Sequence, residues 1–132
     1  MNINDYILQL ETIINSFSLI SSYNLNIDRK SDEIVFISGR IDFRNGTLLD
    51  FKEFVEGTGK GIDKYKYSYN YRRGAHNFFR YDNAPDPRAK GLKSFPHHKH
   101  LEDESITESV ETGLTDVLSE IEKMYQIKDK EE

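Results

Sequence analysis

The sequence predicts an α+β fold, in which an antiparallel meander sheet of about five strands carries an N-terminal and a C-terminal helix packed on one face. Three observations support this prediction. Apolar residues recur with helical spacing near both ends, apolar and polar residues alternate between them, and the connections are of hairpin length. A chain of 132 residues is typical of one domain with its own core, so we expect a single domain over residues 1–132. The absence of cysteine excludes disulfides and thiolate chemistry.

The first half of the chain contains one predicted helix and three predicted strands. Residues 3–17 place their apolar side chains on one helical stripe, which we interpret as part of the core. Alternation then predicts strands over 22–29, 34–43 and 47–55. The dipeptide Asn45-Gly46 separates the last two strands and predicts a tight hairpin turn, because both residues tolerate a positive φ.

The second half contains two more predicted strands, a long loop and a closing helix. The glycine-rich residues 56–61 predict a flexible hairpin loop, and they lack the residues of a phosphate-binding loop. Strands are predicted over 63–72 and 76–82, and the three prolines predict an irregular loop over 83–100. Ser105 and Glu108 fit a capping box, which predicts a helix over 105–125.

The net charge of −5 hides a strong division along the chain. Residues 60–100 contain ten of the 18 Lys and Arg but only three Asp or Glu, whereas residues 101–132 contain three basic and eleven acidic residues. A basic, aromatic-rich surface suits an anionic polymer such as RNA. The alternative is a solvated basic segment beside a solvated acidic helix. We expect the acidic segment to fold back on the basic one, or to present Glu102, Asp103 and Glu104 to a basic partner.

Alternation along 63–72 places four tyrosines on one face of the predicted sheet: Tyr65, Tyr67, Tyr69 and Tyr71. With a two-residue turn at Arg73 and Gly74, that face also receives His76, Phe78, Arg80 and Asp82. The tyrosine rings could stack on RNA bases while Arg80 binds a phosphate. The alternative is that this face is the aromatic core beneath the helices. The opposite face, with Lys64, Lys66 and Arg72, is expected to face solvent.

All four histidines lie between His76 and His100, and three of them occupy the pentapeptide PHHKH at 96–100. Histidine titrates near neutral pH and can therefore give or take a proton there. In an extended segment, His98 and His100 point one way and His97 and Lys99 the other. Two imidazoles in one site could cleave RNA, one activating the ribose 2′-hydroxyl and one protonating the leaving 5′-oxygen. Arg80, Arg73 or Lys99 would then neutralise charge on phosphorus.

Two alternatives compete for the same histidines. Together with Asp82 or Asp86 they could bind a transition metal, although their spacing matches no motif of paired cysteines or helical His-Glu-x-x-His. They could instead be structural, capping the last helix or binding loop carbonyl groups. We expect no cofactor and no resident metal.

Two blocks of sequence carry a resemblance to a known family. The stretches FRYDNAP at 79–85 and FPHHKH at 95–100, with the Tyr-x-Tyr-x-Tyr strand and the flanking helices, resemble the TumE family of small proteins from prokaryotic toxin–antitoxin operons. The resemblance implies the toxin half of a two-gene module, neutralised by a cognate antitoxin that often also binds DNA. Carried over residue by residue, it implies functional roles for Tyr69, Tyr71, Arg80, Tyr81, Asp82, His97, His98 and His100.

The residues and the resemblance together predict a toxin that acts on RNA as a metal-independent endoribonuclease. The predicted catalytic residues are His97, His98, His100, Arg80, Tyr71 and Asp82. The predicted substrate-binding residues are Lys64, Lys66, Tyr67, Tyr69, Arg72, Arg73, His76, Tyr81 and Lys99. The alternatives are a toxin or regulator that binds RNA or protein without cutting it, and a metal-dependent nuclease.

The expected partners are the cognate antitoxin and RNA, with no membrane involved. No apolar run reaches the length of a membrane span, and the N-terminus lacks the basic residues of a secretory signal. We therefore expect a cytoplasmic protein. The oligomeric state stays open, with a homodimer as one alternative.

Overall fold

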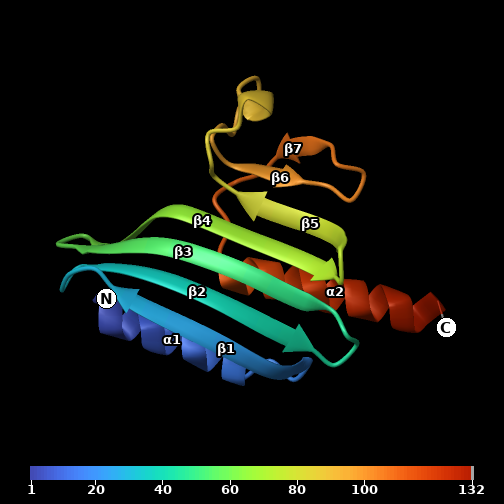
Figure 1. Cartoon of the computed structure of the whole chain (residues 1–132), viewed down its shortest axis with the longest axis horizontal. Coiled ribbons are helices and arrows are strands. Elements are labelled where there is room, and N and C mark those ends of the chain that lie inside the picture. The colour runs from blue at the N-terminus through green and yellow to red at the C-terminus, as the bar shows by residue number, and fades with distance from the viewer. Residues whose placement is uncertain (132) are drawn as a thin grey trace.

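The computed structural model describes residues 1–131, with side chains described as far as Gln126. Seven strands form one antiparallel sheet in the order β1 to β7, and the two helices lie on the same face of it, behind the sheet in Figure 1. The elements are α1 (Ile3–Asn15), β1 (Ile20–Arg29), β2 (Ile34–Phe43), β3 (Leu48–Thr58), β4 (Gly61–Arg73), β5 (His76–Asp82), the 3₁₀ turn η1 (Pro87–Ala89), β6 (His98–His100), β7 (Ile106–Glu108) and α2 (Leu114–Glu131).

The predicted α+β class, the antiparallel meander and the two terminal helices are confirmed, but the strand number is seven rather than five. The two additional strands, β6 and β7, have three residues each. Strands this short leave no measurable alternation in a sequence. They form because β6 pairs with β5 on one side and with β7 on the other.

The core lies between the sheet and the helices. Helix α1 begins with a capping box between Asn2 and Asp5 and buries Ile7 and Ile14, while α2 buries Val117 and Ile121. The facing side chains of β2, β3 and β4 are the alternate residues predicted from the pattern of period two. We call this side the helix-covered face and the other side the open face. None of the described helices is long and apolar enough to cross a membrane.

The turn between β2 and β3 is the predicted one, whereas the turn between β4 and β5 lies at Gly74 and Ala75 rather than at Arg73 and Gly74, because Arg73 pairs with His76. Gly46 has a φ of +84° in the turn between β2 and β3, as the Asn-Gly pair predicts. Gly39 is required for a different reason, because a Cβ at this position would lie only 2.3 Å from Cε1 of Phe51. The glycine-rich segment is a shorter loop than predicted, since β3 continues to Thr58 and β4 starts at Gly61.

Two register shifts change which side chains share a face. In β4, Lys66 pairs with Phe54 and Lys64 with Val55, so Tyr65 is an extra residue and Lys64 turns to the helix-covered face. In β5, Asn77 pairs with Arg72 and Phe79 with Tyr71, which leaves Phe78 unpaired. A β-bulge of this kind shifts the alternation by one residue, so the side chains that follow it point to the opposite face of the sheet.

The predictions for both faces therefore need correction. Asn70 pairs with Arg80 and Ser68 with Asp82, so Arg80 and Asp82 lie on the open face, on the opposite side from Tyr67, Tyr69 and Tyr71. The predicted solvent exposure of Lys64 is also wrong, since this side chain is partly buried between the sheet and the helices.

The predicted start of the last helix is wrong. Ser105 donates its hydroxyl to Asp103 rather than capping a helix, and residues 106–108 form β7. Helix α2 begins at Leu114, and Gly113 lies before it, with its N–H donated to Asp116. The reason is tertiary: pairing with β6 draws residues 106–108 into the sheet, which leaves Val110 81% exposed.

Candidate functional site

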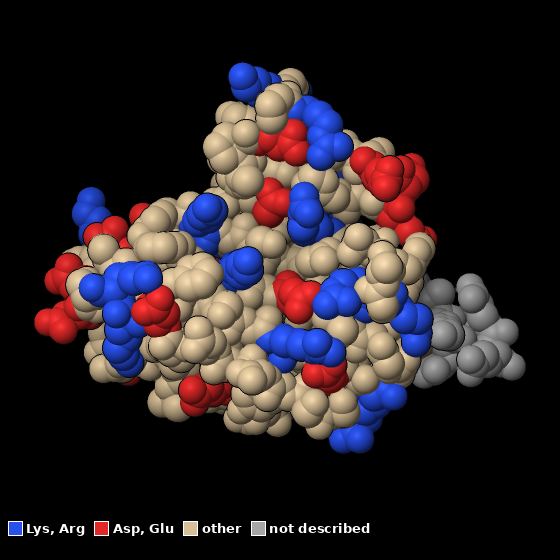
Figure 2. Space-filling view, viewed as in Figure 1, with Lys and Arg blue, Asp and Glu red and all other residues tan. Residues whose placement is uncertain are grey.

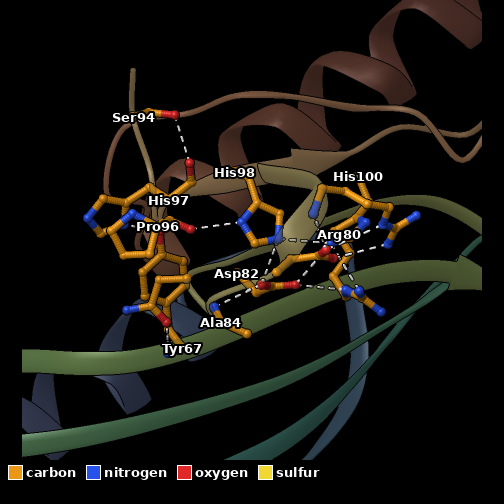
Figure 3. Close-up of polar contacts among 12 residues, drawn as sticks. Tyr67, Arg80, Asp82, Ala84, Ser94, Pro96, His97, His98 and His100 are labelled. Atoms are coloured by element: carbon orange, nitrogen blue, oxygen red, sulfur yellow. Dashed lines mark hydrogen bonds and ion pairs between the residues drawn. The ribbon is translucent and has the colours of Figure 1, made fainter. Parts of the chain in front are cut away.

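Four polar side chains meet on the open face where β5 pairs with β6. Arg80 pairs with His100 and Asp82 with His98, so alternation points all four side chains to the same side (Figure 3). We call these residues the His–Asp–Arg cluster. The segment between β5 and β6, which contains η1, lies at the top of the molecule in Figure 1.

His98 is the most enclosed member of the cluster, with 0% of its surface exposed. Its Nδ1 lies 2.8 Å from the carbonyl oxygen of Pro96, which only accepts, so Nδ1 carries a proton. Its Nε2 lies 2.9 Å from Oδ1 of Asp82 and 3.0 Å from Nε2 of His100. The backbone thus fixes this ring so that its second nitrogen points into the cluster.

Arg80 covers the outer side of the cluster and is the most exposed member, at 45% of its side chain. Its Nε donates to Oδ2 of Asp82 over 3.0 Å, and a terminal nitrogen lies 3.0 Å from Nε2 of His100. The backbone N–H of Ala84 donates to the other carboxylate oxygen of Asp82. Burial lowers the pKa of His100, and the positive charge of Arg80 lowers it further.

The cluster also contains three atoms that could hold a metal ion. The ligand atoms of Asp82, His98 and His100 all lie within 4.8 Å of one another. The Nδ1–H of His98 on a backbone carbonyl is the arrangement that orients metal-binding histidines. The donor set therefore fits a transition metal, but the guanidinium of Arg80 stands at the entrance and already supplies a positive charge to the same atoms.

His97 does not belong to the cluster. The predicted alternation is confirmed, since His98 and His100 point to the open face while His97 and Lys99 point the other way. The His97 ring stacks on Tyr67 at 5.8 Å between centroids, and its Nδ1 lies 2.8 Å from the tyrosine hydroxyl. His97, which the sequence placed in the predicted catalytic set, therefore lies apart from His98 and His100.

Three of the four tyrosines on β4 belong to the core. This favours the interpretation that they form the aromatic core beneath the helices, rather than a surface that stacks on RNA bases. Tyr67, Tyr69 and Tyr71 are each at most 2% exposed. Tyr69 donates its hydroxyl to Glu53 over 2.6 Å, and Tyr71 donates to Thr47 over 2.8 Å. None of these rings is available for stacking on a base, and Tyr71 has no contact with the cluster.

Two predicted cations and one tyrosine lie on the helix-covered face and contact other protein groups. Lys64 donates to Tyr69 and to the carbonyl oxygen of Thr112, and burial lowers its pKa. Lys99 and Tyr81 both contact Glu120 of α2. These contacts confirm that the acidic segment folds back on the basic one.

The remaining predicted residues lie on the open face or at its edge. Lys66 is exposed, Arg72 forms an ion pair with Asp50 over 2.8 Å, and Arg73 donates to the carbonyl oxygen of Asn45. His76 lies 3.1 Å from Glu102. Figure 2 shows Lys and Arg groups spread over this side of the molecule, with carboxylates between them.

Two pockets meet at Arg80. One, of about 510 Å³, is polar and is lined by residues that include Asn70, His76, Arg88 and His100. The other, also about 510 Å³, extends over β3 and β4 and is lined by residues that include Phe36, Phe54, Lys52 and Lys66. Arg88 holds the pKa of Asp86 at about 2 through hydrogen bonds.

Sequence reasoning missed Arg88, Lys52, Phe36 and Phe54. The available signals were Phe36 and Phe54, aromatic residues on the mostly polar sides of their strands.

The fold and the cluster define a small α+β protein whose polar centre stands on the uncovered face of its sheet. The family model described as toxin TumE matches residues 10–125, nearly the whole chain, and the chain belongs to this family. It is therefore a toxin by family, which implies an antitoxin as its partner. No curated protein and no solved structure matches the chain significantly.

Proposed function

We propose that this toxin cleaves RNA at the His–Asp–Arg cluster. The observation that carries the proposal is the meeting of two imidazoles, a carboxylate and a guanidinium between two pockets on the open face. Membership of a toxin family supports a damaging activity on a cellular target. One pocket is lined by Arg80 and Arg88 with Glu102 and Glu104, and the other by Lys52, Lys66 and Arg80 with Glu53 and Asp82. The excess of cations in the second pocket favours a polyanion as that target.

Arg80 is the group that first meets the phosphate. Its exposed guanidinium can form paired hydrogen bonds with two phosphate oxygens. Moving toward the phosphate uncovers Nε2 of His100, whose lone pair accepts from Arg80 in the free protein. Because its pKa is lowered, His100 is neutral at neutral pH and can take a proton from the ribose 2′-hydroxyl.

The reaction then balances with water as the only other participant. The 2′-oxygen attacks phosphorus as its proton passes to His100, the bond from phosphorus to the 5′-oxygen breaks, and that oxygen takes a proton from water. The hydroxide left by that water takes the proton from His100, which restores the free base. The products are a 2′,3′-cyclic phosphate and a 5′-hydroxyl. Asp82 lies 3.3 Å from Nε2 of His100 and stabilises the imidazolium that forms, while the buried His98 is a positioning residue for Asp82.

This proposal revises the predicted catalytic set. His97 and Tyr71 are outside it, because one contacts Tyr67 and the other is buried in the core. His76 lies four residues from Arg80 along β5, about 13 Å at the rise of a strand. It is therefore placed to contact a neighbouring nucleotide rather than to act as the acid at the same phosphate.

The test uses a 5′-labelled single-stranded RNA incubated with purified toxin in an excess of chelator. Fragments ending in 2′,3′-cyclic phosphate are expected, and a substrate with 2′-deoxyribose at the cleaved position should stay intact. RNA that remains whole at every toxin concentration, in a preparation whose toxicity in cells has been shown, would contradict the proposal.

A metal-dependent nuclease is the second candidate, favoured by the three converging ligand atoms of Asp82, His98 and His100. In that case Asp82, His98 and His100 would hold the ion, which would supply an activated water as the nucleophile, so the 2′-deoxy substrate would be cut without a cyclic phosphate product. Elemental analysis of untagged protein, followed by cleavage with and without chelator, separates the two chemistries. A stoichiometric metal whose removal abolishes cleavage would replace the metal-independent mechanism.

A further inference from the structure

A strip of three aromatic rings crosses the open face close to the cluster. Phe36 on β2, Phe54 on β3 and Tyr65 on β4 are neighbours, with ring centroids 5.8 Å apart for the first pair and 4.9 Å for the second. Tyr65 is 45% exposed, and both phenylalanines are partly exposed. We call these residues the aromatic strip.

The strip is not part of the hydrophobic core. Its strand neighbours Val35, Ile37 and Val55 are 0% exposed and face the helices, so the strip points to the side that carries no helix. The β4 bulge places Tyr65 beside Phe54 instead of beside Tyr67. Aromatic surface left in water costs free energy, and adjacent exposed rings are a feature of many binding sites.

The charges around the strip point to an anionic ligand with flat rings. Lys66 pairs directly with Phe54, and Lys52 lies on the same side of β3, two residues away. Neither lysine makes an ion pair or a side-chain hydrogen bond with any residue whose side chain is described. At the far end of the strip, desolvation raises the pKa of Tyr65, and the negative charges of Glu56 and Asp63 raise it further. These carboxylates repel phosphate, so a phosphate backbone is favoured at the lysine end.

Two of the three rings of the strip line a pocket together with two residues of the cluster. Phe36, Phe54, Lys52 and Lys66 line the same cavity of about 510 Å³ as Arg80 and Asp82. The register places Phe54 two strands and two residues from Asp82, about 10 Å across the sheet and about 7 Å along it. A short single strand of RNA can therefore lie over both.

We propose that the aromatic strip is a stacking site for a base of single-stranded RNA, next to the phosphate held by Arg80. Lys52 and Lys66 bind the connecting phosphates, and the rings of Phe54 and Tyr65 contact the base. Stacking on aromatic side chains accepts any base and needs an unpaired strand. This inference rests on the proposed function, and it adds that the substrate is single-stranded and is held at a second point.

The experiment measures binding of a fluorescent single-stranded RNA that carries 2′-O-methyl groups and so cannot be cleaved by the proposed reaction. Phe54→Ala is expected to weaken binding about tenfold or more. Phe54→Leu keeps apolar volume but removes the ring, so it should weaken binding nearly as much, whereas Phe54→Trp should preserve it. Tyr23→Ala, at an aromatic residue of β1 that is 38% exposed, should change binding less than about twofold.

An RNA series with one abasic position at a time identifies the stacked base. The abasic position that weakens binding to the wild-type protein should have little further effect on Phe54→Ala, because both changes remove the same contact. Additive losses at every position would overturn the proposal, as would Phe54→Ala or Phe54→Leu with unchanged affinity.

The outcomes separate this inference from the proposed function. Unchanged binding by Phe54→Ala with normal cleavage removes the stacking site and leaves the nuclease. Normal RNA binding with loss of antitoxin binding shows that a protein segment covers the strip, which also overturns the proposal. A wild-type toxin that neither binds nor cuts RNA contradicts both.

Discussion

Both faces of this sheet carry carboxylates that are hydrogen-bonded to other polar side chains, but the network on one face is buried and the cluster on the other is open to solvent. On the helix-covered face, Glu53 is fully buried and accepts hydrogen bonds from Tyr6 and Tyr69, and Lys64 donates to Tyr69 and to a carbonyl oxygen. On the open face, Asp82 holds two imidazoles and an exposed guanidinium.

The difference between the faces lies in access to water. Burial and Glu53 raise the pKa of Tyr6 and Tyr69, so both hydroxyls stay protonated and the buried network stays closed. The His–Asp–Arg cluster is enclosed on the His98 side only, and Arg80 opens it to two pockets. Buried polar residues on one face of the sheet thus stabilise the fold, whereas the cluster on the other face is the proposed place of the chemistry.

The largest expected effect is the contrast between two histidines three positions apart. His100→Ala should slow RNA cleavage about 100-fold or more, because it removes the base. His97→Ala removes the same chemical group from the helix-covered side and should change the rate less than about twofold. Cleavage rates of both variants, with melting temperatures as a folding control, check this contrast. Equal losses would remove the functional distinction between the faces.

Next in size is a loss of stability without loss of chemistry. Glu53→Ala leaves the hydroxyls of Tyr6 and Tyr69 and the ammonium of Lys64 without the carboxylate, and should lower the free energy of unfolding by about 3 kcal/mol. Urea unfolding measures this change, and cleavage per folded molecule should stay near wild type. A stable variant with no activity would assign Glu53 to the reaction instead.

The pH dependence of the cleavage rate should follow the titration of His100. Its pKa lies below the ordinary value of 6.5, so the rate should rise with pH through that lowered pKa and level off before neutrality. Arg80→Gln removes a charge that opposes protonation and should move the rising limb to higher pH. Arg73→Gln, whose guanidinium contacts Asn45, should not move it. Identical limbs in wild type and Arg80→Gln would contradict the role of Arg80.

The lowered pKa of His100 also determines how the free energy of unfolding changes with pH. The unfolded chain protonates His100 near pH 6.5, while the folded protein resists that proton. The contribution of His100 to stability is therefore intact above 6.5 and declines as pH falls through the lowered pKa. The difference in unfolding free energy between wild type and His100→Ala should therefore be constant above pH 6.5 and shrink only in that acidic range. A difference that changes with pH above 6.5 would contradict this assignment.

The smallest expected effect is that of an ion pair on the open face. Arg72 and Asp50 lie 2.8 Å apart but are 28% and 41% exposed, so solvent screens their attraction. Arg72→Ala should lower the free energy of unfolding by at most about 1 kcal/mol, and less at high salt. A double-mutant cycle with Asp50→Ala measures the coupling, and a larger or salt-independent value would show that this face is less open to water than the structure indicates.

Much of the fold followed from patterns of period two and 3.6, because those patterns record burial directly. The alternation along β2 and β3 and the Asn45-Gly46 turn are examples of such local signals. The start of α2 could not be obtained this way, since Ser105 and Glu108 satisfy a capping pattern that tertiary pairing overrides.

The sequence predicted the residues of the candidate site, but it did not predict which of them lie together on one face of the sheet. Arg80, Asp82, His98 and His100 stand in the predicted catalytic set, and the extended segment after Pro96 correctly separated His98 from His97. The bulge at Phe78 places Arg80 and Asp82 on the opposite face from Tyr67, Tyr69 and Tyr71. A single unpaired residue reverses the face of a strand, and nothing in the local sequence marks it.

The most direct test of the central claim is a map of where RNA touches the toxin. Backbone amide chemical shifts should be followed while a 2′-O-methyl single-stranded RNA is added to the isotope-labelled protein. The account predicts that the changes concentrate on the open face, at Phe54, Lys66, Arg80 and His100, and spare α1 and α2. Changes confined to the helices, with the open face unaltered, would contradict it.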